Sequence, residues 1–489
     1  MSTALNQANQ AVNRLRSEVK KDFYPEFHLT PPAGWMNDPN GLIYFNGLYH
    51  AFYQHHPFDE NWGPMHWGHM TSPDLVHWQH QLIALAPDQD YDRDGCFSGC
   101  AVDDNGVLTL IYTGHRWLKE VGDDSAIQEV QCIATSEDGI YFTKHGPILQ
   151  PPKDIMHFRD PKVWKQDERW YLVVGARDLH DTGQILLYSA TDLRHWQFER
   201  ILARASQKQG YMWECPDFFP LQDKFILMFS PQGIQAEGYQ FRNQFQSGYL
   251  IGNWTPNNPF NVEHDFQELD AGHDFYAPQS FLAADGRRII FGWMDMWESP
   301  MPSKADHWAG SFTLPRELSL GKQGNILIRP IRELTALRQN DIHIPPIQII
   351  SQHKTLDCPA SSIELQVIFD LKQSTAERYG LELMASEDGK YATRLYIDNQ
   401  AARLIFDRSQ SGKAVTGYRS VPLNSHADSL HLHIFIDRSS VEIFINHGEN
   451  CITSRIYPLG ENHRVNLYAE NGSACISSFQ GWQLSSIYR

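Results

Sequence analysis

Three acidic residues occupy similar positions in three copies of a repeated sequence unit. Asp38, Asp160 and Glu214 lie eight, seven and eight residues before the polar turns at 46, 167 and 222, and each is followed by proline within two positions. Proline lacks an amide donor and fits the first residue of a strand. Like charges raise one another's pKa when they are close, so acids in phase indicate a functional cluster. We expect the three carboxylates to converge at one site.

Such a cluster suits cleavage of a glycosidic bond, where one carboxylate attacks the anomeric carbon and a protonated one donates to the leaving oxygen. Glu214 lies between Trp213 and Cys215. This more apolar setting predicts a raised pKa and the role of acid. Asp38 follows Asn37, a polar neighbour, and is predicted to be the nucleophile.

Asp160 directly follows Arg159. The adjacent positive charge is expected to keep Asp160 ionised. An ionised third acid can hydrogen-bond to substrate hydroxyls and strengthen those bonds in the transition state.

The repeat that carries these acids consists of short apolar runs, each preceded by a turn rich in Asn, Asp, Gln or Gly. Aromatic markers at Trp78, Phe142, Trp196 and Trp254 follow four of the runs at a period near sixty residues. Such units, with about four strands each, predict the blades of a propeller, whose first strands line the central channel. A large irregular sandwich is the alternative. The five runs span residues 48–53, 107–112, 170–174, 225–229 and 288–293.

The pattern changes after residue 330. Apolar and polar residues alternate over 363–369, 430–436 and 441–445, which predicts an antiparallel β-sandwich. The whole chain is therefore predicted to be all-β: a five-bladed β-propeller followed by a C-terminal antiparallel β-sandwich, with a short N-terminal helix. The expected divisions are an N-terminal helical segment (1–24), the catalytic propeller (25–335), a linker (336–350) and the supporting sandwich (351–489).

Composition narrows the function classes. The 489 residues carry 41 Lys and Arg against 58 Asp and Glu, a net charge of −17, which argues against nucleic acid or an anionic membrane as partner. No apolar run is long enough to span a membrane, and the polar first residues do not form a secretory signal. Seven cysteines without a CxxC pair predict buried, reduced thiols in a cytoplasmic protein.

The acids also lie in segments that resemble signatures of glycoside hydrolase family 32, the family of invertases, sucrose-6-phosphate hydrolases and fructanases. These segments are Trp-Met-Asn-Asp-Pro-Asn-Gly at 35–41, Phe-Ser-Gly at 97–99, Arg-Asp-Pro at 159–161 and Glu-Cys-Pro at 214–216. The resemblance covers nearly the whole chain and is closest to bacterial intracellular sucrose hydrolases. It implies a retaining β-fructofuranosidase that hydrolyses sucrose through a covalent fructosyl-enzyme intermediate and needs no cofactor.

The same resemblance assigns roles to individual positions. It places the nucleophile at Asp38, the acid/base at Glu214 and the transition-state stabiliser at Asp160. It also implies a set of substrate-binding residues and no metal ligands. The substrate-binding set is Trp35, Asn37, Gln54, Trp62, Phe97, Ser98, Arg159, Asp274, Tyr276 and Trp293.

Alternatives to sucrose hydrolysis remain open at this point. The second most favoured function is hydrolysis of sucrose-6-phosphate, and the third is fructosyl transfer. A non-catalytic carbohydrate-binding propeller is an alternative of another class. The segments expected to form the rim of the site hold four cations against eight acids, which favours neutral sucrose over its phosphate ester. We expect a small-molecule substrate and a monomer or weak homo-oligomer.

Overall fold

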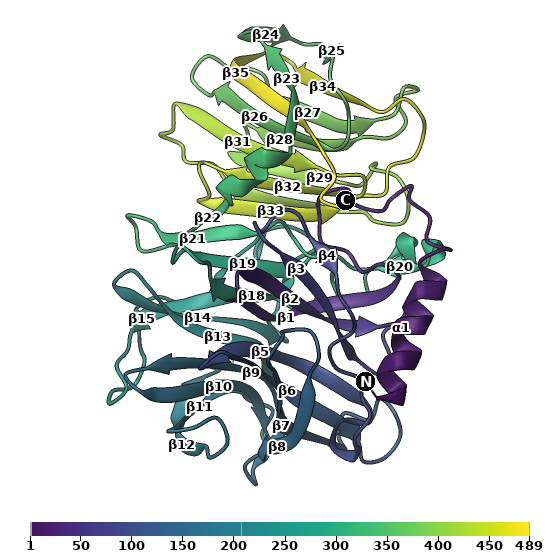
Figure 1. Cartoon of the computed structure of the whole chain (residues 1–489). Helices are drawn as coiled ribbons and strands as arrows, with labels where there is room; N and C mark the ends of the chain where they lie inside the picture. Colours follow the sequence, from purple (N-terminus) through teal and green to yellow (C-terminus); the bar gives the residue numbers. More distant parts are fainter. Residues whose placement is uncertain (1, 207, 489) are drawn as a thin grey trace.

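The computed structural model describes residues 2–206 and 208–488, and strands dominate it (Figure 1). Helix α1 (Thr3–Leu15) opens the chain, and the Ser2 side chain caps it by accepting a hydrogen bond from the Leu5 amide. Its apolar face, with Ala8 and Val12, packs on Ile83 at the edge of the first blade. Across the described residues, no helix is both long and apolar enough to cross a membrane.

Five antiparallel sheets follow in chain order and form the blades of the predicted five-bladed propeller (Figure 1). The first contains β1 (Gly34–Phe45), β2 (Leu48–His56), β3 (His66–Ser72) and β4 (Gln79–His80), and the second β5 (Gly95–Asp104), β6 (Val107–Trp117), β7 (Ile127–Ser136) and β8 (Thr143–Leu149). The third contains β9 (Ile155–Gln166), β10 (Arg169–Asp178), β11 (Gly183–Ala190) and β12 (Gln197–Arg204). The fourth contains β13 (Met212–Leu221), β14 (Lys224–Gln232), β15 (Gly248–Asn253), β16 (Asn261–Val262) and β17 (Gln267–Glu268), and the fifth β18 (Tyr276–Leu282), β19 (Arg288–Trp293), β21 (Arg316–Leu320) and β22 (Ile326–Pro330).

The first strand of every blade lies innermost, so β1, β5, β9, β13 and β18 surround the central channel. Each packs beside the next, and β18 packs back against β1 to close the ring. The short strand β20 (Trp308–Ala309) pairs in parallel with β1 and ties the end of the propeller to the first blade. Three 3₁₀ turns, η1 (Asp90–Asp92), η2 (Pro302–Asp306) and η3 (Arg332–Leu337), complete this part.

Two sheets form the C-terminal sandwich, with the alternate apolar residues of both facing each other. Leu365, Ile434, Leu381 and Leu467 are among the side chains in this core. One sheet contains β23 (Arg338–Ile344), β24 (Ile347–Ile350), β26 (Ile363–Asp370), β31 (Ser429–Ile436), β32 (Ser440–Ile445), β33 (Asn450–Arg455) and β35 (Ser473–Leu484). The other contains β25 (His353–Thr355), β27 (Arg378–Ala385), β28 (Thr393–Asp398), β29 (Arg403–Asp407), β30 (Tyr418–Pro422) and β34 (Arg464–Glu470).

The segment 336–350 differs from the expected linker. Both of its strands, β23 and β24, pair with β35 and extend the first sheet of the sandwich. The two prolines at 345 and 346 only interrupt this edge between the strands. Proline is tolerated there because an edge position needs no amide donor on its outer side.

A buried cluster of charges joins the propeller to the sandwich. The Arg316 guanidinium from β21 binds Asp270 at 2.8 Å and Glu442 of β32 at 2.5 Å, and all three side chains are fully buried. The His28 imidazole lies 2.8 Å from both Glu442 and Asp437. Burial opposes protonation of His28, but hydrogen bonds to these two acids raise its pKa to about 9. The propeller and the sandwich are thus fastened by paired charges as well as by apolar contacts.

Candidate active site

A cavity of about 230 Å³ opens at one mouth of the propeller channel. It brings together nine residues that the sequence predicts for the site: Asn37, Asp38, Gln54, Trp62, Phe97, Ser98, Arg159, Asp160 and Glu214. Five strands, β1, β2, β5, β9 and β13, supply all of these residues except Trp62, which lies in the loop after β2. The ring of innermost strands therefore gathers side chains that lie far apart in the sequence.

Every innermost strand carries a β-bulge at the same height in the channel, and the bulges position the acids. The bulged residues include Asp38, Ser98, Asp160, Cys215 and Ala277, each followed by proline or glycine. Asp160, Cys215 and Ala277 share a positive φ of 66°, 49° and 49°. A bulge re-aims its side chain, which explains why the site lies at this level.

The three acids are expected at equivalent positions of their blades, and for Glu214 this expectation is wrong by one residue. Cys215, not Glu214, takes the place equivalent to Asp160, with the same left-handed backbone. The Cys215 amide donates to Asp160 Oδ2 at 3.0 Å, and its thiol lies 3.5 Å from Asp38 Oδ2. Counting back from the turns misses this shift because it cannot detect a bulge.

Asp38 has the polar support that the sequence predicts. Ser98 Oγ donates to its Oδ2 at 2.7 Å, and Asn37 Nδ2 donates to Oδ1 at 3.1 Å. Burial raises the pKa of Asp38 to about 6; the Ser98 hydrogen bond opposes this rise and the nearby Glu214 adds to it. At neutral pH the carboxylate is therefore mostly ionised while it remains shielded from water.

Asp160 differs from the expectation that Arg159 keeps it ionised. Burial raises its pKa to about 8; the Arg159 charge opposes the rise, while the charges of Glu214 and Asp38 add to it. The Arg159 side chain hydrogen-bonds to Glu214 instead of Asp160. Adjacent residues on a strand point to opposite faces, so neighbours in sequence need not be partners. The acid cluster accordingly holds a proton near neutral pH.

Glu214 lies in a polar setting, not the apolar one that its neighbours predict. Arg159 donates to its Oε1 from Nε at 3.0 Å and from Nη2 at 2.8 Å. Gln232 donates to Oε2 at 2.7 Å, and the Tyr276 hydroxyl donates to the same oxygen. Trp213 turns away and stacks on Phe229, with ring centroids 4.1 Å apart.

Glu129 on β7 is a site residue that no sequence motif predicts. Its carboxylate lies 3.3 Å from Arg159 Nη1 and accepts a hydrogen bond from the Phe158 amide at 2.7 Å. Although burial opposes ionisation, the Arg159 charge and His115 hold the pKa of Glu129 well below its usual range. Glu129 thereby fixes the guanidinium that binds Glu214. It lies on a third strand of its blade and carries no proline marker, so no sequence signal distinguishes it.

Aromatic side chains form one wall of the cavity. Trp297 lines it and stacks on Trp35 at 5.9 Å, and Trp35 Nε1 donates to Asn37 Oδ1 at 2.7 Å. Trp293 differs from expectation because it is fully buried behind Trp297, 5.0 Å from it, and does not line the cavity. Trp62 stands edge-on to Phe97. Trp297 is missed from the sequence because its loop carries no repeat marker.

Asp274 also lies elsewhere than the sequence predicts. Its buried carboxylate binds Arg408 at 2.6 Å and Arg455 at 3.0 Å, both from the sandwich. The charges of these two arginines overcome the effect of burial and hold the pKa of Asp274 well below its usual range. Asp274 fastens the start of β18 to the second domain, whereas Tyr276, two residues later, reaches Glu214.

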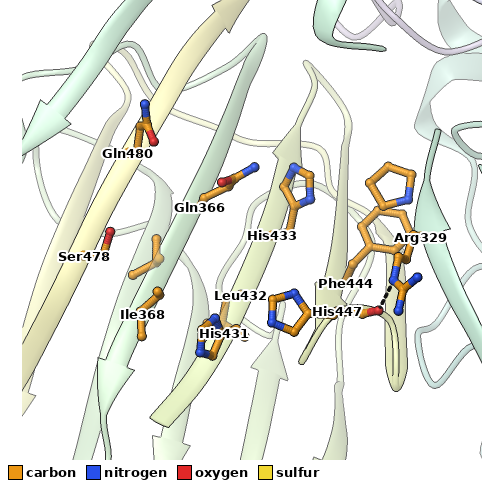
Figure 2. A pocket seen from close by; sticks show the side chains of 12 residues that line it. Arg329, Gln366, Ile368, His431, Leu432, His433, Phe444, His447, Ser478 and Gln480 are labelled. Carbon is orange, nitrogen blue, oxygen red and sulfur yellow. Dashed lines mark hydrogen bonds between the residues drawn. The ribbon is translucent and has the colours of Figure 1, made fainter. Parts of the chain in front are cut away.

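A second hollow, of about 270 Å³, lies on the outer face of the sandwich beside β22 (Figure 2). Its polar side chains carry imidazoles, amides, the Ser478 hydroxyl and the Arg329 guanidinium, which donates to the His447 carbonyl at 2.6 Å. None of the described residues that line it is an Asp or Glu. It therefore lacks the paired acids that cleavage of a glycosidic bond needs.

Comparisons with known proteins agree with the fold. Residues 28–330 match the model of the glycosyl hydrolases family 32 N-terminal domain, and residues 333–483 match that of the family 32 C-terminal domain. A sucrose-6-phosphate hydrolase of Escherichia coli is 58% identical, covering 98% of this chain and 99% of its own, and a raffinose invertase of Escherichia coli is 52% identical, covering 99% and 100%. A Bombyx mori family 32 β-fructofuranosidase variant, solved in complex with sucrose, superimposes with a TM-score of 0.88 at 33% identity and covers 100% of this chain and 99% of its own. The chain is thus an enzyme that belongs to glycoside hydrolase family 32.

Proposed function

We propose that this enzyme hydrolyses sucrose, a β-fructofuranoside, to glucose and fructose with retention of configuration. One observation carries the proposal: Asp38, Asp160 and Glu214 meet in one cavity of a family 32 propeller. The relatives named for sucrose-6-phosphate, raffinose and β-fructofuranoside cleavage support a fructoside as substrate.

In the first step, Asp38 attacks the anomeric carbon of the fructosyl unit while Glu214 donates a proton to the leaving glucose oxygen. The bond to glucose breaks, and an ester to Asp38 forms. In the second step Glu214 takes a proton from water, which attacks the ester and releases fructose. Ser98 and Asn37 hold Asp38 in position through the hydrogen bonds at 2.7 and 3.1 Å.

Asp160 serves as the third acid. Its position beside the Cys215 amide fixes one oxygen and leaves the other for hydroxyl groups of the fructosyl ring. Arg159 binds Glu214 and so controls where the acid/base carboxylate lies. Gln54, whose amide donates to the Cys96 carbonyl at 2.9 Å, and Trp62 complete the proposed fructose pocket.

The charges of the cavity favour neutral sucrose over sucrose-6-phosphate. Arg159 is the single Arg or Lys among the described lining residues, and it already binds Glu129 and Glu214. The lining carboxylates are Asp38, Asp124, Glu129, Asp160 and Glu214. Phosphate binds best to free Arg or Lys donors. Three of the four rim cations are already engaged: Arg116 pairs with Asp90 at 2.7 Å, Lys304 lies over the Trp35 ring and Arg242 lies over the Tyr418 ring.

Initial rates on sucrose and sucrose-6-phosphate at equal low concentration test this order. We expect sucrose to be cleaved faster, with little dependence on salt. A large advantage of the phosphate ester that disappears at high salt supports the sucrose-6-phosphate alternative instead. Release of reducing sugar distinguishes both from a carbohydrate-binding protein, and the ratio of free glucose to free fructose reveals any fructosyl transfer.

We also place the protein in the cytoplasm. All seven cysteines are free thiols, and burial raises the pKa of Cys215 well above its usual value. Reduced thiols are typical of that compartment. Fractionation of the source cells, with the enzyme activity as marker, tests this location.

A further inference from the structure

The innermost strands of the propeller line a second cavity beyond the active site. Its volume is about 640 Å³, within the range of small-molecule sites. The four innermost strands that supply the active site, β1, β5, β9 and β13, also line this cavity with residues nearer their C-terminal ends. On β9, for example, Lys165 follows Asp160 by five residues, about 16 Å along a strand. The cavity is thus the opposite mouth of the channel.

Three buried polar atoms of residues that line this opposite mouth lack hydrogen-bond partners in the described chain. They are Arg288 Nε, Trp164 Nε1 and Asp217 Oδ1. The Arg288 guanidinium makes no hydrogen bond to any described residue. It lies over the Phe219 ring, 4.6 Å from the ring centroid. Buried polar groups are normally satisfied, so three such atoms around one cavity indicate a missing partner that both donates and accepts.

The charge of the opposite mouth is the reverse of the active site. Among the described residues that line it, Lys162, Lys165 and Arg288 face one acid, Asp217. Lys162 lies 3.2 Å from Asp217 and neutralises it, and Asp217 Oδ2 also accepts hydrogen bonds from Ser280. Lys165 lies 3.7 Å from the exposed Glu168, so Arg288 is left as the one lining cation with no ion pair among the described residues. An anionic ligand fits this arrangement.

Aromatic rings make up much of the remaining wall. Tyr44, Trp164, Phe218, Phe219 and Phe281 all line the cavity. Such rings stack on the apolar faces of sugars, and a guanidinium fork suits phosphate. We propose that the opposite mouth of the channel binds a phosphorylated hexose, with the phosphate on Arg288 and a sugar hydroxyl donating to Asp217 Oδ1.

Equilibrium titration with glucose 6-phosphate tests the site, with tryptophan fluorescence or heat as the readout. We expect Arg288→Met to weaken binding at least about tenfold, the loss of one charge-assisted contact. Arg329→Met is the matched control, since it removes the same charge from an exposed position on β22 of the same blade, and it should leave binding unchanged. Arg288→Lys keeps the charge without the fork and should give intermediate binding.

Three further arms separate this site from the active site and from simple anion binding. Binding should persist in the Asp38→Asn protein saturated with sucrose, because the two cavities lie at opposite ends of the channel. Glucose alone should bind far more weakly than glucose 6-phosphate. Inorganic phosphate should also bind less tightly, and its binding should require Arg288. The proposal is overturned by no binding at about 10 mM, by equal binding to Arg288→Met, or by displacement with sucrose.

Discussion

The guanidinium of Arg159 holds Glu214 with two donors on one oxygen, Nε at 3.0 Å and Nη2 at 2.8 Å from Oε1. Glu129 fixes the other side of the same guanidinium at 3.3 Å. The proposed acid/base therefore has its position set by a buried ion pair between two blades. Its second oxygen is bound by Gln232 and Tyr276.

Replacement of Arg159 by lysine should lower kcat/KM for sucrose about 100-fold. An ammonium keeps the charge but cannot donate two hydrogen bonds in the planar geometry that holds Glu214. Steady-state kinetics on sucrose measure the change. Arg177→Lys is the control, because Arg177 pairs with Asp181 at the surface, and it should alter the rate less than about twofold. A rate for Arg159→Lys that matches this control contradicts the role of Arg159.

The fall of kcat/KM at acidic pH should follow the protonation of Asp38. Its carboxylate must be ionised to attack, and burial raises its pKa to about 6. We expect kcat/KM to fall as the pH drops below about 6. Ser98→Ala should move this limb to higher pH, since the Ser98 hydrogen bond lowers the pKa. Ser72→Ala, which removes a hydroxyl bonded to Asp74 instead, should leave the limb in place. An identical limb in all three proteins contradicts the assignment.

The same raised pKa predicts how stability depends on pH. The folded state binds the Asp38 proton more tightly than the unfolded state does, so the protonated carboxyl favours folding. This contribution to the free energy of unfolding is fully present below the ordinary pKa of 3.8 and is lost as the pH rises through about 6. Above that pH the buried carboxylate costs about 3 kcal/mol. Asp38→Asn should therefore raise Tm at pH 8 but hardly at pH 4. Thermal unfolding at both values measures this, and a lower Tm of the variant at pH 8 contradicts it.

Much of the fold follows from local sequence rules, and the parts that do not have physical reasons. Turns before apolar runs predict the blades, and the acids beside prolines predict the cavity that Asp38 and Asp160 share. Glu129 and Gln232 are not predicted from the sequence because they lie on the third and second strands of their blades. Nothing in the sequence distinguishes them there from core residues. Asp274 is misplaced because its partners, Arg408 and Arg455, come from another domain.

Arg316→Met should destabilise the whole molecule by about 3–5 kcal/mol. The substitution leaves Asp270 and Glu442 buried without their cation, at the contact between propeller and sandwich. Denaturant unfolding, followed by fluorescence and circular dichroism, measures the loss. Arg332→Met removes an exposed arginine paired with Asp285 and should cost less than about 1 kcal/mol. Equal stability of the two variants contradicts a structural role for the buried cluster.

The most direct test of the proposed mechanism is the rate at which Asp38→Asn releases fructose from sucrose. An amide of the same shape keeps the cavity but cannot form the ester, so we predict a loss of at least about 10⁴-fold with the fold and sucrose binding retained. Asp124→Asn, which changes another cavity-lining acid, serves as the control and should stay within about tenfold of the parent enzyme. Retention of more than about 1% of the parent rate by Asp38→Asn contradicts Asp38 as the nucleophile.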